Sequence, residues 1–274
     1  MDWLEELAQA VRDGSSGAFD GASTAVIVAM VVVAFLLLVV SVVAVINSIV
    51  LFFSYIKYNR TQNSIGLPGK EIARQVLDKH GLQDVAVSAS GSILFGNSYS
   101  HYFKKVRLRR LTWKKDSISS LAMAVQKSSL AIMDRTGDRD MKTRVALTPW
   151  IYFGPLAFIP LVLLGIVLDL FIFTSSNVLW TMLLTGAGLV LYLVAFVMAL
   201  MVLKTEKKAQ AKALEIMRTD NLATEDEIAM CQNLFHLYNI EYVNDMITAL
   251  LELVYRVLQL VASARSSSSS SSHR

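Results

Sequence analysis

The chain has 274 residues, of which 54% are hydrophobic and 18% charged, and its formal net charge is +4 at pH 7. With a mean hydropathy of +0.48, this composition excludes an ordinary soluble domain and indicates a membrane protein. The single cysteine, Cys231, excludes an intramolecular disulfide and a metal cluster held by several thiolates.

The first apolar segment predicts a retained transmembrane helix. Residues 21–56 carry no charged side chain, and this run exceeds the roughly 20 residues that a helix needs to cross a bilayer. A cleaved signal peptide would begin with basic residues and have a shorter apolar core, whereas residues 1–20 are acidic, with Arg12 as their only basic side chain. We therefore expect an acidic tail at 1–20 and a span at about 25–54.

Residues 57–148 predict a basic domain with its own secondary structure. The stretch "GLPGKEIARQVLDKHGLQDVAV" is typical of a helix followed by a strand, with Gly81 in the position of a helix C-terminal cap. "VAVSASGSILFG" and "KVRLRRLTW" alternate as strands do, so a small α/β unit is expected. "SLAMAVQKSSLAIMD", residues 120–134, has helical spacing but no side chain that obviously carries chemistry.

Two more uncharged runs predict a transmembrane hairpin within 149–203, with spans at about 151–173 and 178–203. Asp169 and the turn-like "TSSN" at 174–177 separate them. An ionisable residue inside a membrane is a functional candidate; the alternative is that Asp169 lies at the membrane interface, close to the turn.

The C-terminal region, 204–264, predicts helices. Thr224 and Glu227 have the spacing of a capping box. In 243–263 one narrow polar stripe runs along an otherwise apolar helix, which indicates a helix in the membrane interface or one packed in a bundle beside the spans. The serine-rich residues 265–274 are of low complexity and are expected to be disordered.

Charge asymmetry predicts the orientation. From Lys57 to Arg144 there are 17 Lys and Arg residues against 7 Asp and Glu residues. The positive-inside rule then places the N-terminus outside, 57–148 in the cytoplasm, the turn at 174–177 outside and the C-terminal region inside.

The residues alone reveal no reaction. The four histidines are scattered without ligand spacing, and neither a glycine-rich phosphate loop nor a nucleophile elbow is present. The basic cluster "KKVRLRRLTWKK", 104–115, could bind nucleic acid or lie near anionic lipid headgroups.

The order and wording of the segments resemble the membrane-embedded neutral zinc metallopeptidases of the YugP type, a bacterial family. The resemblance begins at "YIKYNRTQNSIGLPGKEIARQVLDKHGLQDVAV", continues through "KVRL", the hairpin and "EKKAQAKALEIMRTDNLATEDE", and covers roughly 55–261. It implies a mostly helical membrane protein: three transmembrane helices, a membrane-associated C-terminal amphipathic helix, and a small cytoplasmic α/β unit that resembles a zincin.

The same resemblance places the family's catalytic motif on residues that cannot perform its chemistry. In the family, the helix at 120–134 would carry His-Glu-x-x-His, in which two histidines bind Zn²⁺ and the glutamate activates water. Laid on this chain, the motif falls on Gln126, Lys127 and Leu130, whereas a later glutamate ligand is retained as Glu206. Upstream, "NSYSHY" departs from the family's Asp-His-Tyr-Asp-Pro at Asn97, Ser98 and Ser100.

We therefore expect a catalytically inactive relative that binds no zinc, has no catalytic residue and acts in the bacterial inner membrane as a scaffold or regulatory partner. Its partners would be membrane lipid and an active metallopeptidase paralogue or another membrane protein, with nucleic acid disfavoured. One alternative is an active metallopeptidase with other ligands, among which His101 and Glu206 are the available candidates. A second alternative is a basic module that binds anionic lipid or nucleic acid.

A further expectation concerns what replaces the metal. Lys127 would approach Glu206 and form a partly buried ion pair between two helices; the alternative is that both side chains point to water.

Overall fold

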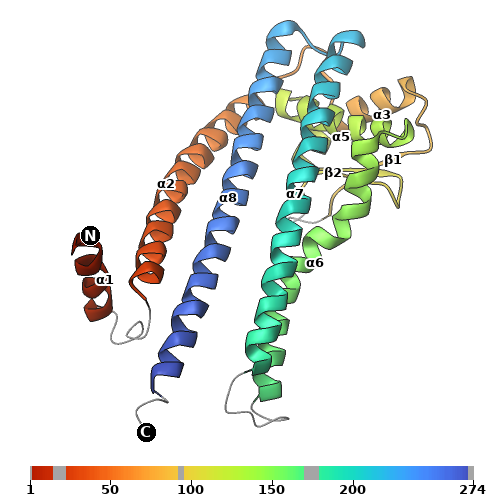
Figure 1. The fold of residues 1–274 in the computed structure, drawn as a ribbon. Coiled ribbons are helices and arrows are strands. Elements are labelled where there is room, and N and C mark those ends of the chain that lie inside the picture. Colours follow the sequence, from red (N-terminus) through yellow and green to blue (C-terminus); the bar gives the residue numbers. More distant parts are fainter. Residues whose placement is uncertain (1, 15–22, 92–95, 170–178, 271–274) are drawn as a thin grey trace. The chain divides into compact units, whose positions relative to one another are not determined.

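The chain is mostly helical, as expected, in a computed structural model that describes residues 2–14, 23–91, 96–169 and 179–270. The helices are α1 (Asp2–Gly14), α2 (Thr24–Arg60), α3 (Gly69–Lys79), α4 (Arg110–Lys114), α5 (Ile118–Arg135), α6 (Arg139–Val167), α7 (Leu179–Thr219) and α8 (Glu225–Ser270). The strands are β1 (Ala86–Ala89), β2 (Ser98–Ser100) and β3 (Lys105–Leu108). Figure 1 shows their arrangement.

Two helices, α2 and α7, contain stretches that are long and apolar enough to cross a membrane. Large apolar side chains of both helices point outward: Phe35 of α2 is 63% exposed and Val190 of α7 is 61% exposed. A water-soluble protein rarely leaves so large an apolar surface uncovered, which supports membrane association. These stretches match the spans predicted at 25–54 and 178–203. The span predicted at 151–173 is helical to Val167; its end and the turn at 174–177 lie outside the described residues, so the number of spans stays a prediction.

Contacts divide the chain into two compact units, and the first comprises residues 1–46 and 243–274. In it, Ala8 of α1 and Ala262 of α8 are buried against Ile27 and Met30 of α2. The segment 1–20 is therefore not a plain tail, because it includes a helix with a buried side. The end of α8 lies beside the beginning of the apolar α2, which favours the bundle interpretation of the last helix.

The serine-rich end differs from expectation. Helix α8 continues to Ser270, so residues 265–270, expected to be disordered, are helical, and 271–274 lie outside the described part. Extending an existing helix fixes only one residue for each new hydrogen bond and is far easier than starting one, so α8 runs on into a sequence with little preference of its own.

The second unit, residues 47–242, contains the expected small α/β arrangement. The strand order is β1-β3-β2, with β1 parallel and β2 antiparallel to β3. Helices α3 and α5 contact the sheet and lie on one side of it in Figure 1. Val106 of β3 is in register with Val87 and Tyr99 on its two neighbours and belongs to the core. The strand predicted for "KVRLRRLTW" ends at Leu108, which is the last residue paired with β1; residues 110–114 form α4 instead.

Helix α5 forms the centre of this unit, and its whole circumference is covered. Almost every residue from Ile118 to Met133 is buried, including polar ones such as Ser128 and Ser129. A helix enclosed on all sides requires small and apolar side chains, which explains the composition of 120–134.

The start of α8 is tied to the loop after α2. The predicted capping box is present: the Thr224 amide donates to the Glu227 carboxylate at 2.8 Å, and the Glu227 amide donates to Thr224 Oγ1 at 3.3 Å. The same carboxylate accepts hydrogen bonds from the amide and the hydroxyl of Ser64, both at 2.6 Å. The Glu227 side chain thus links the N-terminus of α8 to the loop that follows α2.

Helices α6 and α7 pack closely at Gly165, where α6 meets the first residues of α7. A Cβ atom at Gly165 would lie 2.6 Å from Thr181 Cα and 2.9 Å from Trp180 O, so only glycine allows this approach. Asp169 caps α7, accepting hydrogen bonds from the amides of Trp180 at 3.0 Å and Thr181 at 2.7 Å. Its carboxylate satisfies amides that the first turn of α7 leaves open, which is a structural role.

We predict that Gly165→Ala destabilises the hairpin by roughly 1–3 kcal/mol, because the added methyl group overlaps backbone atoms of α7. The matched control is Gly186→Ala, also in a helix, where an added Cβ meets nothing within 4 Å. Thermal unfolding in detergent should show a lower Tm for the first variant only. Equal behaviour of the two variants would contradict the close packing.

Candidate functional site

The positions of the degenerate motif lie where α5 meets α6 and α7. Gln126 and Lys127 direct their polar ends toward α7, whereas Leu130 is fully buried in the apolar core. Arg144, six residues into α6, reaches the same place. Three helices therefore contribute to one cluster of polar side chains around Glu206 of α7.

The Glu206 carboxylate has a partner on each oxygen. Its Oε1 accepts a hydrogen bond from the Arg144 guanidinium at 2.7 Å. Its Oε2 accepts one from Gln126 Nε2 at 3.0 Å and one from Lys127 Nζ at 3.1 Å. The Lys127, Arg144 and Glu206 side chains are only 11%, 17% and 20% exposed. The expected Lys127–Glu206 ion pair is present, and we call this set of four residues the Glu206 cluster.

The cluster holds two cations against one anion. Burial acts to raise the pKa of the Glu206 carboxyl group, but the charges of Lys127 and Arg144 outweigh it and hold this pKa below its ordinary value. Glu206 follows Leu203, where the apolar stretch of α7 ends, so these charges lie outside the span. A carboxylate that remains ionised near two cations joins α5, α6 and α7 electrostatically.

A second group of ion pairs lies at the start of α6. Asp138 caps this helix by accepting hydrogen bonds from the amides of Asp140 and Met141. Lys208 pairs with both acidic residues, and Lys204 pairs with Asp140 at 3.0 Å. The hydrogen bond from Lys208 is the main reason that the pKa of Asp138 is lowered. The orientation of α6 on α7 is thus fixed around the Glu206 cluster.

The residues of the cluster do not fit a zinc ion. Catalytic zinc takes three protein ligands from His, Asp, Glu or Cys and one water. Here the motif positions hold the amide of Gln126, the ammonium group of Lys127 and the apolar side chain of Leu130. Glu206 is already paired with Lys127 and Arg144. In the described part of the chain, no group of three or more His, Cys, Asp or Glu residues could hold a metal.

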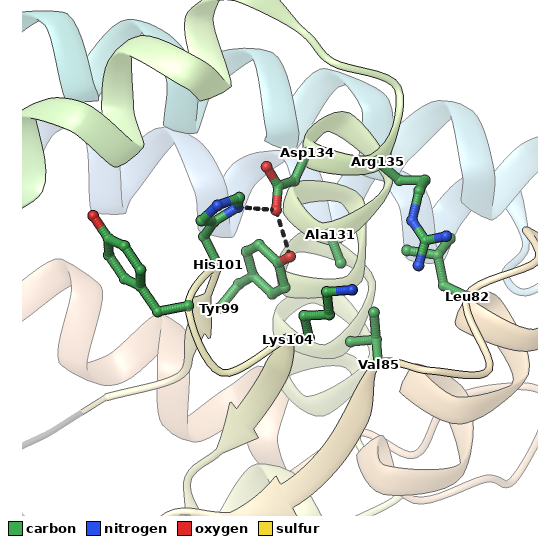
Figure 2. A pocket seen from close by; sticks show the side chains of 9 residues that line it. Leu82, Val85, Tyr99, His101, Lys104, Ala131, Asp134 and Arg135 are labelled. Atoms are coloured by element: carbon green, nitrogen blue, oxygen red, sulfur yellow. Dashed lines mark hydrogen bonds and ion pairs between the residues drawn. The ribbon is translucent and has the colours of Figure 1, made fainter.

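A separate cavity of about 400 Å³ lies at the C-terminal end of α5. It is lined by Leu82, Val85, Tyr99, His101, Tyr102, Lys104, Ala131, Asp134 and Arg135. Figure 2 shows Tyr99 and His101 converging on the Asp134 carboxylate, which accepts hydrogen bonds from Tyr99 Oη at 2.6 Å and His101 Nδ1 at 2.7 Å.

This arrangement fixes the tautomer of His101. A carboxylate only accepts hydrogen bonds, so the Nδ1 atom that faces Asp134 carries a proton, and the neutral ring has its acceptor at Nε2. Burial, followed by the hydrogen bond to Asp134, raises the pKa of Tyr99, so its hydroxyl stays protonated. The structure pairs His101 with Asp134, whereas Glu206 is paired with Lys127 and Arg144; the two ligands of the alternative reading are not brought together.

Comparison with known proteins identifies the class. The family model described as "Putative neutral zinc metallopeptidase" matches residues 31–261, most of the chain, so this protein belongs to that family. A relative, "Putative membrane protease YugP" of Bacillus subtilis (strain 168), is 25% identical over 209 residues, which are 75% of this chain and 86% of the relative. No solved structure matches.

Sequence reasoning did not find Arg144 or Asp134. The sequence did contain an indication for Arg144. In a helical hairpin, the residues just before the first helix's apolar segment lie beside those just after the second one's, and Arg144 and Glu206 occupy these two positions. Asp134 stands about two turns after Gln126 on α5, and nothing in the sequence indicated that β2 would carry Tyr99 to it.

We predict that Lys127 and Glu206 are energetically coupled. In a double-mutant cycle with Lys127→Ala and Glu206→Ala, the coupling free energy should be roughly 1–3 kcal/mol, as for contacting residues in one network. Glu206→Ala should be the more damaging single change, because it leaves two partly buried cations without their anion. Chemical denaturation of the purified protein measures these values.

Lys212 and Glu215 provide the control cycle on the same helix. They form an exposed pair at 3.0 Å, for which about 0–1 kcal/mol is expected. Because the pKa of Glu206 is lowered on folding, its contribution is present above the unfolded-state pKa of about 4.3 and is lost as the pH falls through the folded value. Strictly additive effects of Lys127→Ala and Glu206→Ala at neutral pH would rule out the coupling.

Proposed function

We propose that this protein is a catalytically inactive member of the zinc metallopeptidase family that acts in the bacterial inner membrane as a scaffold or regulatory partner. The observation that carries the proposal is the pairing of Glu206 with both Lys127 and Arg144. In this arrangement the retained ligand is occupied by two cations of the chain itself. A hydrolytic mechanism needs a group that activates water, and the motif position for that group holds a lysine.

The proposed scaffold role is supported by the parts of the family architecture that this chain retains. Helix α5 remains the buried centre of the unit, and ion pairs in place of a metal hold it to α6 and α7. Such a protein can still present the family's surfaces to a partner. The partner that we propose is an active family member with an intact His-Glu-x-x-His. The test is co-expression of the two chains, which should co-purify stably in detergent. A zinc peptidase of another family, co-expressed in the same way, should not co-purify.

We expect the purified protein to bind no stoichiometric zinc. Elemental analysis after purification in detergent without chelator measures the metal content directly. The reason is electrostatic, since a divalent cation at Glu206 would displace or repel two paired cations. About one zinc per chain, lost on Glu206→Ala or His101→Ala, would overturn the proposal and support the alternative of an active metallopeptidase with other ligands.

A designed variant tests the alignment independently. Gln126→His, Lys127→Glu and Leu130→His together restore the motif but leave Arg144 on Glu206. Adding Arg144→Gln should raise zinc affinity further, because it frees Glu206 to serve as the third protein ligand. If neither variant binds zinc while both remain folded, the placement of the motif on α5 is wrong.

We also propose a multi-pass topology with the N-terminus outside and 57–148 in the cytoplasm. A reporter that is active only in the cytoplasm should give signal when fused at residue 100 and none when fused at residue 176. The basis is the excess of 17 Lys and Arg over 7 Asp and Glu between residues 57 and 144. The opposite pattern would reverse the orientation.

A further inference from the structure

The three-stranded sheet has one covered face and one open face, and the open face is basic. Strand β3 alternates buried Val106 and Leu108 with outward-pointing Lys105 and Arg107. Helices α3 and α5 contact the sheet and lie on the same side of it in Figure 1. Lys105 and Arg107 therefore stand in the middle of the opposite face.

Their neighbours in the sheet are small. Arg107 is in register with Ser88 of β1 and Ser98 of β2, and Lys105 with Ala86 and Ser100. Residues in register on adjacent strands share a face, so two cations stand among serine and alanine without an acidic neighbour on the strands. Such a face can be approached closely by a flat, negatively charged surface.

The positive charge continues into α4. Arg109, Arg110 and Lys114 are exposed. Among the residues that the structure describes, neither these three nor Lys105 and Arg107 take part in an ion pair. We call these five residues the basic face. In the described residues its cations have no ion-pair partner, in contrast to those of the Glu206 cluster.

Aromatic side chains border the basic face. Tyr102 and Phe103, in the turn between β2 and β3, are 70% and 71% exposed, and the Arg107 guanidinium lies 5.7 Å from the centre of the Phe103 ring. Exposed aromatics next to basic residues are typical of the water–lipid interface. In Figure 1 the strands lie between α3 and α5 on one side and the lower part of α6 on the other, so the sheet stands on the side of the segment for which a span is predicted.

We propose that the basic face lies on the headgroup layer of the protein's own membrane and binds anionic phospholipids. Single-stranded nucleic acid would also find positive charge here, but sheets that bind it present aromatic rings on the strands for stacking bases. On this sheet the outward positions are Ala, Ser, Lys and Arg, and the rings stand only in the turn. Lipid headgroups need charge and close approach, which the basic face offers.

Full-length protein reconstituted in vesicles tests the proposal. A fluorophore on Tyr102→Cys reports proximity to brominated lipids; Cys231 does not compete for label, because it is buried and burial raises the pKa of its thiol to about 12. Quenching should be at least about twofold stronger in vesicles of phosphatidylcholine with phosphatidylglycerol than in phosphatidylcholine alone, and weaker at high salt.

The variant Lys105→Gln with Arg107→Gln should abolish the difference between the two lipid compositions. The control variant, Lys70→Gln with Lys212→Gln, removes the same net charge from exposed residues elsewhere in the fold. This variant should retain the difference in quenching between the two lipid compositions. Unfolding midpoints of all variants confirm that they fold. Equal quenching in both vesicle types, or a difference that survives in the Lys105/Arg107 variant, would overturn the proposal.

A second experiment tests whether the basic face binds nucleic acid instead of anionic lipid. Fluorescence anisotropy of a labelled single-stranded oligonucleotide is measured with the protein in uncharged detergent. Tight binding that is lost in the Lys105/Arg107 variant, combined with no effect of phosphatidylglycerol on quenching, would assign the basic face to nucleic acid instead. Absence of such binding together with lipid-dependent quenching supports the lipid assignment.

Discussion

The packing of α5, α6 and α7 in the second unit depends on the carboxylate of Glu206. Glu206 accepts hydrogen bonds from Arg144, Lys127 and Gln126, so α5, α6 and α7 meet at its two oxygens. Removing it would leave two partly buried cations near each other, and charges in such places destabilise a fold strongly when their partner is lost. The capping of α6 by Asp138 and the pairs formed by Lys204 and Lys208 then fix the direction in which α6 leaves this point.

Membership of a peptidase family does not by itself show that a chain performs the family's chemistry. The family match extends over residues 31–261 and so includes every position of the Glu206 cluster. A fold is maintained by burial and hydrogen bonding along the whole chain, whereas a catalytic site depends on a few side chains. In α5, the buried residues on all sides preserve the helix, and only the donors on the side facing α7 differ from what a zinc ion requires.

The sequence predicted the features that depend on local patterns. The apolar stretches of α2 and α7, the helix at 120–134, the capping box of Thr224 and Glu227 and the Lys127–Glu206 pair were all accessible from spacing, capping chemistry or family alignment. The short strand β2, the end of β3 at Leu108 and the helical state of 265–270 were not, because each depends on neighbours distant in sequence or on propagation from an adjacent helix. The pairing of His101 with Asp134 belongs to the same class, since it requires β2 to be placed first.

The surroundings of Glu206 also oppose single substitutions that would build a metal site. Starting from the present chain, Lys127→Glu alone would place a second carboxylate beside Glu206 and remove one of its two cations, Gln126→His alone would put a titratable ring among cations, and Leu130→His alone would bury an imidazole in an apolar core. Each step toward a metal site is thus opposed by like charge or by desolvation before any metal can compensate for it. Building a metal site on this chain would therefore require several coordinated substitutions, because each single change is opposed by the residues already in place.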